Sequence, residues 1–213
     1  MKKLLTYAAC AMLFMGCAGS KPTNSKGGWV TVFDGKTFTG WKVGANASTF
    51  KIEDGAIVVN GPRAHLFYEG PLQNHDFKNF EFKAKVMTLP GSNSGMFIHT
   101  VYQEDGWPSK GYEIQVNQTH TDWRKTGSVY GVQDVKEVFV KDNEWYTEHI
   151  IVQGKKVTVK INDKVINEYT EPDNVERKGG DAQKKLSSGT VALQGHDPKS
   201  KVYYKDIMIK PLP

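Results

Sequence analysis

Cysteine is almost absent from this sequence. The 213 residues include only two, Cys10 and Cys17, and none follows them. The rest of the chain therefore cannot form a disulfide bond, and its stability has to come from a hydrophobic core. About 185 residues remain after the N-terminal segment, which is enough for one domain with such a core.

Long apolar runs are also scarce, and the one that stands out lies at the N-terminus. Met1-Lys2-Lys3 provides a basic start, and Leu4–Met15 is apolar but too short to cross a bilayer as a stable anchor. A small residue then precedes the cysteine in Met15-Gly16-Cys17. This order predicts a lipoprotein signal peptide over residues 1–16, cleaved before a lipidated Cys17. An ordinary secretory signal is the alternative.

The segment after the signal peptide resembles a linker. Residues 17–28 are rich in Ser, Gly, Lys, Pro and Asn and show no apolar period, which is typical of a flexible tether. We expect residues 29–213 to form a single domain, held in the cell envelope by the lipid on its periplasmic or outer-membrane face. The lipid anchor is the only membrane contact that the sequence predicts.

A strong charge imbalance is missing too. Lys and Arg number 28 and Asp and Glu number 23, so the net charge is +5. Loss of Lys2 and Lys3 with the signal peptide would lower it to 26 − 23 = +3. A charge this small and evenly spread argues against a nucleic-acid partner.

Helical periodicity is absent beyond a turn or two, and short alternating runs take its place. Phe80–Met87 alternates apolar and charged residues, as a half-buried antiparallel strand does. Asp54-Gly55 separates Phe50–Glu53 from Ala56–Val59, which is a strong hairpin signal. Ten or more such strands predict an all-β fold, a jelly-roll β-sandwich of two antiparallel sheets.

Three of the expected strands carry polar residues that should share one face of a sheet. In a strand, residues i and i+2 point to the same side. If the alternating apolar residues face the core, the outward residues are His99, Glu113, Gln115, Gln194 and His196. Any one of them alone could be a solvated surface residue. Their combination indicates a binding or catalytic site.

Residues around these strands are suited to sugars. Aromatic rings pack on the apolar faces of pyranoses, while carboxylate, amide and guanidinium groups bind their hydroxyls. His65 and Arg63 lie at a strand edge from which they could reach the site. The predicted substrate-binding residues are Gln115, Gln194, Tyr112, Trp107, Tyr130, Trp123, Arg63 and His65.

One expected catalytic residue is missing. Jelly-roll glycosidases of the laminarinase type present two carboxylates from a strand that reads Glu-x-Asp-x-(x)-Glu. The equivalent run is Glu113-Ile114-Gln115-Val116-Asn117-Gln118, which retains one carboxylate. The usual two-carboxylate hydrolysis is therefore not available from this strand.

A series of short motifs is spread over the whole expected domain: Trp29–Lys36, Gly40-Trp41, Asp54–Ile57, Phe77–Phe82, Asn93–Phe97, Gly111–Gln115, Tyr130-Gly131, Glu144–Tyr146, Val159–Asn162, Leu193–Asp197 and Ile207–Lys210. In this order they resemble the 3-keto-disaccharide hydrolase domain family. This resemblance implies a concanavalin-like jelly roll, common in envelope lipoproteins.

The resemblance further implies cleavage of glycosides that are oxidised to a ketone at sugar C3. The ketone acidifies the C2 proton; a base removes it, the enolate is stabilised, the C1 group leaves, and water can add. His99 or His196 would suit the base. Glu113 and Gln115 would orient hydroxyls or, with a His, hold a divalent cation such as Ca²⁺, Mn²⁺ or Zn²⁺.

Two functions without catalysis remain open at this level. The same aromatic and amide side chains would suit a carbohydrate-binding module. An interaction or scaffold domain of a larger envelope complex is the third alternative.

Overall fold

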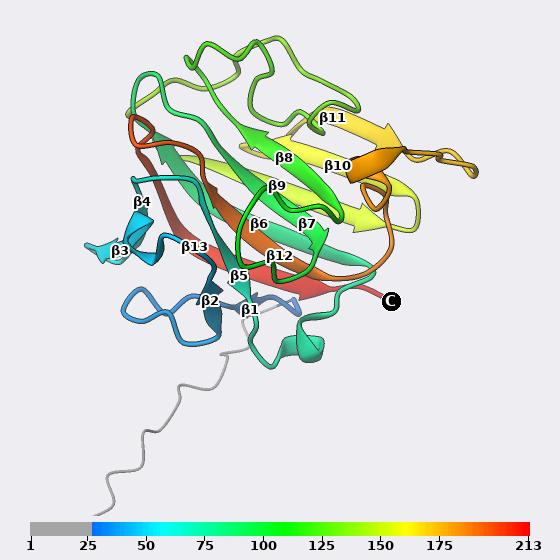
Figure 1. Ribbon diagram of the computed structural model, residues 1–213, viewed down its shortest axis with the longest axis horizontal. Helices are drawn as coiled ribbons and strands as arrows, with labels where there is room; N and C mark the ends of the chain where they lie inside the picture. The colour runs from blue at the N-terminus through cyan, green and yellow to red at the C-terminus, as the bar shows by residue number, and fades with distance from the viewer. Residues whose placement is uncertain (1–26) are drawn as a thin grey trace, which may run out of the picture.

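The computed structural model of the protein describes residues 27–213. The predicted signal peptide, the lipidation site at Cys17 and most of the predicted tether lie outside these residues. The described chain forms two β-sheets that pack face to face (Figure 1). None of its helices is long and apolar enough to cross a membrane.

The larger sheet has eight strands and forms the back layer in Figure 1. All its pairings are antiparallel. The order across the sheet is β11 (Lys164–Thr170), β10 (Lys156–Ile161), β9 (Tyr146–Gln153), β6 (Phe80–Thr88), β13 (Val202–Pro211), β4 (Ala56–Val59) and β3 (Phe50–Glu53), and β1 (Val30–Thr31) also pairs with β13.

The smaller sheet has five strands, again all antiparallel. Their order is β2 (Trp41–Val43), β5 (Ala64–Tyr68), β12 (Thr190–Gly195), β7 (Ser94–Thr100) and β8 (Tyr112–Val116). The remaining elements are three short 3₁₀ helices, η1 (Ala47–Thr49), η2 (Leu72–His75) and η3 (Gly179–Asp181). The prediction of an all-β fold with two antiparallel sheets is confirmed.

The strands form where alternation and turn residues predict them. On β6, Phe80 and Phe82 are fully buried while Lys85 on the other face is exposed. Between β3 and β4, Asp54 and Gly55 both adopt positive φ, of 49° and 77°. Such a two-residue turn matches the twist of the flanking strands and so fixes their register.

One hydrophobic core lies between the sheets. Phe82 and Ile209 from the larger sheet pack in the same cluster as Met96, Ile114 and Leu193 from the smaller one. A second, small cluster of Phe67, Phe97 and Ala192 lies apart from this core. Since these three residues alternate with core residues along β5, β7 and β12, they mark the outer face of the smaller sheet.

Glu148 on β9 is an exception within the core. Its side chain is fully buried, and neither carboxyl oxygen has a hydrogen-bond partner among the described residues. Burial raises its pKa well above the ordinary value of 4.5, so folding favours the protonated acid. The unfolded chain ionises above pH 4.5, and the folded state therefore loses stability as the pH rises from there towards the folded pKa.

We expect Glu148→Met to raise the free energy of unfolding, by more at pH 8 than at pH 5. The difference between the two gains should be about 1 kcal/mol or more, because only the wild type has to keep a buried acid protonated at the higher pH. Urea unfolding at both pH values measures it, with the exposed Glu53→Gln as the control. Equal gains at the two pH values would show that the pKa of Glu148 does not differ between the folded and unfolded states.

Candidate active site on the smaller sheet

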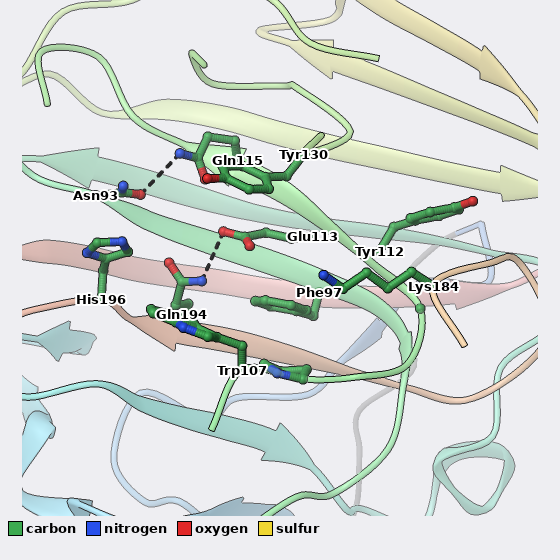
Figure 2. Close-up of a pocket in the computed structure, with 12 residues that line it drawn as sticks. Asn93, Phe97, Trp107, Tyr112, Glu113, Gln115, Tyr130, Lys184, Gln194 and His196 are labelled. Carbon is green, nitrogen blue, oxygen red and sulfur yellow. Dashed lines mark hydrogen bonds between the residues drawn. The ribbon is translucent and has the colours of Figure 1, made fainter. Parts of the chain in front are cut away.

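A pocket of about 280 Å³ opens on the outer face of the smaller sheet. Its floor comes from three adjacent strands, with Phe97 on β7, Glu113 and Gln115 on β8, and Gln194 on β12 (Figure 2). The volume is slightly below the range for small-molecule sites, about 300–1,000 Å³. The prediction that these polar strand residues converge on one face is confirmed for Glu113, Gln115 and Gln194.

Strand register brings the floor residues together. Phe97 is paired with Glu113 and Gly95 with Gln115 across β7 and β8. Leu193 is paired with Met96 across β12 and β7, which places Gln194 beside Gly95. Gln194 and Gln115 therefore flank a position that has no side chain.

The carboxyl group of Glu113 occupies the space above Gly95. A Cβ atom at Gly95 would lie 2.5 Å from Glu113 Oε1. Gln194 Nε2 donates a hydrogen bond of 2.9 Å to the same oxygen (Figure 2). The Gln115 amide makes better hydrogen bonds when its oxygen and nitrogen exchange places. In that orientation its nitrogen also lies 3.0 Å from Glu113 Oε1. Two amide groups thus hold one carboxyl group at the centre of the floor.

Burial raises the pKa of Glu113 to about 8, although the hydrogen bond from Gln194 and the charge of Lys184 oppose this rise. The negative charge of Asp122 adds to it. A carboxyl group that titrates near neutral pH can both accept and donate a proton under physiological conditions. Glu113 therefore has the environment of a general acid–base group.

His196 forms part of the pocket wall and is held by its chain neighbour. Its Nδ1 lies 2.8 Å from Asp197 Oδ2. Asp197 also accepts hydrogen bonds from Ser200 Oγ, at 2.7 Å, and from the Lys199 amide, at 2.8 Å. Against the effect of burial, the hydrogen bonds from Ser200, His196 and Lys199 lower the pKa of Asp197 to about 2. An ionised Asp197 can accept a hydrogen bond from a proton on His196 Nδ1 and so orients the imidazole ring.

Trp107 and Tyr130 are the aromatic residues that line the pocket with their rings exposed. The Trp107 ring lies 5.4 Å from that of His196. The Tyr130 hydroxyl donates to Asp122 Oδ2 at 3.0 Å. The two rings lie on opposite sides of Glu113 in Figure 2, where either could pack against a sugar ring.

The predicted orientation of His99 is wrong. Thr190 pairs with Thr100 and Ala192 with Phe97, so two residues of β7 lie opposite the single residue Val191. His99 is the extra residue of this bulge, with a φ of 54°. A bulge interrupts the alternation of faces along the strand.

The bulge turns His99 towards the core. Its Nε2 donates to Lys78 O at 2.9 Å, and its Nδ1 accepts from the Ser187 amide at 3.2 Å. The ring lies 5.6 Å from that of Phe80, a core residue of the larger sheet. Burial lowers the pKa of His99. With both nitrogens occupied and the ring outside the pocket, it is not placed to act as the base.

Tyr112 lines the pocket as predicted, but its hydroxyl points away, donating to Glu171 Oε2 and accepting from Arg177 at 3.1 Å. Three other predicted substrate-binding residues lie outside the lining. The pocket lining among the described residues does not include Trp123, Arg63 or His65.

Each of those three has other contacts. Trp123 is exposed, with the Arg124 guanidinium 4.8 Å from its ring. Arg63 pairs with Asp105 at 3.0 Å. His65 is buried beside Trp107, with the two rings 5.8 Å apart, and burial lowers its pKa to about 3. The Arg63 guanidinium also lies 5.3 Å from the Trp107 ring, so His65 and Arg63 both pack against Trp107.

Sequence reasoning missed four residues at the site. Asn93 and Lys184 line the pocket, and His120 and Asp197 adjoin His196. The adjacency of His196 and Asp197 in the sequence was a usable signal for that pair. His120 and Lys184 lie in loops, where no periodicity indicates which way a side chain points.

A metal site that includes Glu113 is not supported by the geometry. Among residues 27–213, one group of three or more His, Cys, Asp and Glu side chains could hold a metal ion, and it consists of His120, His196 and Asp197. Glu113 instead faces amide groups.

Several solved structures share this architecture. A proposed glycosyl hydrolase from Parabacteroides distasonis superimposes with a TM-score of 0.72 at 24% identity, covering 87% of this chain and 94% of that one. A non-specific endo-β-1,3(4)-glucanase gives 0.54 at 12% identity over 90% and 94%, and the Bacillus subtilis carbohydrate-binding module CBM66 gives 0.56 at 10% over 80% and 95%. At these identities the likeness shows the fold alone, and it confirms the laminarinase-like jelly roll.

Sequence comparison gives the family. A 3-keto-disaccharide hydrolase from Bacteroides thetaiotaomicron is 30% identical over 169 residues, which make up 67% of this chain and 58% of the relative. The chain thus spans less than two thirds of the length of that enzyme. The model of the 3-keto-alpha-glucoside-1,2-lyase-like domain matches residues 28–210. As its motifs predicted, the chain belongs to the 3-keto-alpha-glucoside-1,2-lyase-like domain family.

Proposed function

We propose that this protein cleaves glycosides whose sugar already carries a ketone at C3, by removing the C2 proton and expelling the group at C1. The observation that supports this most is the isolation of Glu113, the one carboxylic acid lining the pocket in the described part of the chain. Its pKa is raised to about 8. A single titrating acid suits proton transfer but not the paired-carboxylate chemistry of ordinary glycosidases.

One carboxyl group is sufficient for this reaction, because it removes a proton and then returns it. Ionised Glu113 takes the proton from C2, which the C3 ketone has acidified, and the electron pair forms an enolate. The C1–O bond then breaks as a C1=C2 double bond forms, and the leaving oxygen takes the proton back from Glu113. Addition of water across that double bond, with hydroxyl at C1 and hydrogen at C2, gives net hydrolysis.

The other pocket residues have binding roles in this proposal. Trp107 and Tyr130 stack on the sugar ring, and the Gln194 carbonyl oxygen, which is buried without a partner in the described structure, accepts a sugar hydroxyl. A non-catalytic carbohydrate-binding module is the alternative, favoured by the same stacking surface. Binding alone would not require an acid whose pKa lies near neutrality.

The N-terminal sequence supports a location for this activity in the cell envelope, with the domain tethered through a lipid on Cys17. The substrate would then be a glycoside or oligosaccharide that is present outside the cytoplasm.

We expect Glu113→Gln to lower kcat by at least about 100-fold on a chromogenic 3-keto-α-glucoside, because the amide cannot accept the C2 proton. In the wild type, kcat/KM should rise with pH and level off above about pH 8, because the ionised form is the base. Glu104→Gln, an exposed acid on a nearby loop, is the control. Wild-type rates in Glu113→Gln, or equal cleavage of the unoxidised glucoside, would falsify the proposal.

A methyl group at Gly95 should displace the Glu113 carboxyl group without unfolding the sheet. The added Cβ would lie 2.5 Å from Oε1 and 2.8 Å from Cγ of Glu113. We expect Gly95→Ala to reduce kcat/KM by about 10- to 100-fold, since small misplacements of a catalytic group have effects of this size. Gly180→Ala, where a Cβ meets nothing within 4 Å, is the matched control. Equal activity of the two variants would show that the position of Glu113 is not critical.

Substitution of the predicted lipidation site tests the location. Cys17→Ser should abolish incorporation of labelled fatty acid and move the protein from the membrane fraction to the soluble fraction. Cys10→Ser, within the predicted signal peptide, should leave both unchanged. If Cys17→Ser still carries the label and stays with the membrane, the anchor lies elsewhere.

A further inference from the structure

Beside Glu113, the pocket edge carries a cluster of two imidazoles and one carboxylate. One ligand atom from each of His120, His196 and Asp197 lies within 4.8 Å of the other two. His196 and Asp197 directly follow β12, and His120 lies in the loop after β8. All three side chains are partly exposed, and His196 lines the pocket. An ion bound here would therefore be reached from the substrate side.

The spacing of the cluster is close to that of a coordination sphere. Two ligands of one ion, each at about 2.1 Å, lie about 3 Å apart when adjacent and about 4 Å apart at most. The contact between His196 and Asp197 is 2.8 Å, and the rings of His120 and His196 meet edge to face with their centroids 5.5 Å apart. The separations within the cluster reach up to 4.8 Å, so an ion would have to draw the side chains closer together.

The protons of the two imidazoles can rearrange to admit an ion. His196 Nδ1 and Asp197 Oδ2 lie side by side, so an ion bound by both would replace the proton between them. His120 Nδ1 lies 3.4 Å from the Asn93 amide. Turning over the Gln115 amide favours turning over that of Asn93 as well, because the Gln115 oxygen then faces Asn93 at 3.2 Å and needs a donor.

The turned Asn93 then presents its oxygen to His120. His120 can carry its proton on Nδ1 and offer Nε2 to an ion, at the loss of the 3.1 Å contact that Nδ1 accepts from the Asp122 amide. A ligand histidine whose second nitrogen donates to an amide or carboxylate oxygen is the usual arrangement at metal centres. The amide orientation that provides Glu113 with a second donor thus also gives His120 an acceptor for a proton on Nδ1.

The geometry points to a divalent transition-metal site formed by His120, His196 and Asp197, with open coordination positions towards the pocket. Two imidazoles and one carboxylate favour Zn²⁺ or Mn²⁺ over Ca²⁺ and Mg²⁺, which prefer oxygen ligands throughout. When bound, the ion would act as a Lewis acid on an oxygen of the substrate. This last role rests on the proposed function, whereas binding of the ion does not.

Metal binding can be measured directly on untagged protein that a chelator has freed of metal. In calorimetric titrations with Zn²⁺ and Mn²⁺ we expect one equivalent, bound at micromolar affinity or tighter, and weaker binding of Ca²⁺. His120→Ala should weaken binding at least about 10- to 100-fold. Asp197→Asn should weaken it too, but Asp197 also holds its own turn, so His120→Ala is the decisive variant. His75→Ala, at the end of η2 and outside the cluster, is the control.

The outcomes separate this site from the proposed function. Failure of the wild type to bind either ion, or equal binding by wild type and His120→Ala, would overturn the site. Full cleavage of a 3-keto-glucoside by metal-free protein would refute the Lewis-acid role while leaving the proposed function intact. Binding of one ion that is lost in His120→Ala, with no turnover of the keto-sugar, would support the site and contradict the proposed function.

Discussion

The hydrogen bond from Gln194 Nε2 to Glu113 Oε1 passes above Gly95 and connects the two strands that flank β7. It exists because the strand register places a glycine between two side chains long enough to meet. The sandwich core beneath holds that register. The acidity of Glu113, and with it the chemistry that the pocket can support, therefore depends first on the pairing of three strands, and the charges of the loop residues Lys184 and Asp122 modify it.

Alternation along a strand was sufficient to predict part of this site. Glu113 and Gln115 were assigned to the outer face from the apolar residue between them, and the structure places them there. The same rule, applied fully, puts Tyr112 on the inner face with Ile114, and the two residues belong to the same core cluster. His99 could not be predicted in this way, because its bulge arises from the pairing of β7 with β12 and leaves no mark on the local pattern.

Loop residues set the other limit of prediction. The turn Asp54-Gly55 could be predicted from the sequence, because few residue types adopt two adjacent positive φ angles. His120 and Lys184 lie in longer connections, where tertiary contacts decide the direction of each side chain. Trp123 illustrates the reverse case: an aromatic residue suited to sugars that a loop turns outwards, against Arg124. The fold was therefore more predictable than the wall of the pocket.

The replacement of a second acid by Gln115 has a consequence for how this strand relates to those of two-acid glycosidases. Gln115 provides an amide hydrogen that can reach Glu113. A carboxylate there would put a second negative charge against an acid that is already difficult to ionise, and would raise the pKa of one of the two further. Glu113 and Gln115 therefore form one hydrogen-bonded pair on this strand. A single substitution at residue 115 would not convert the site into that of a conventional two-acid glycosidase.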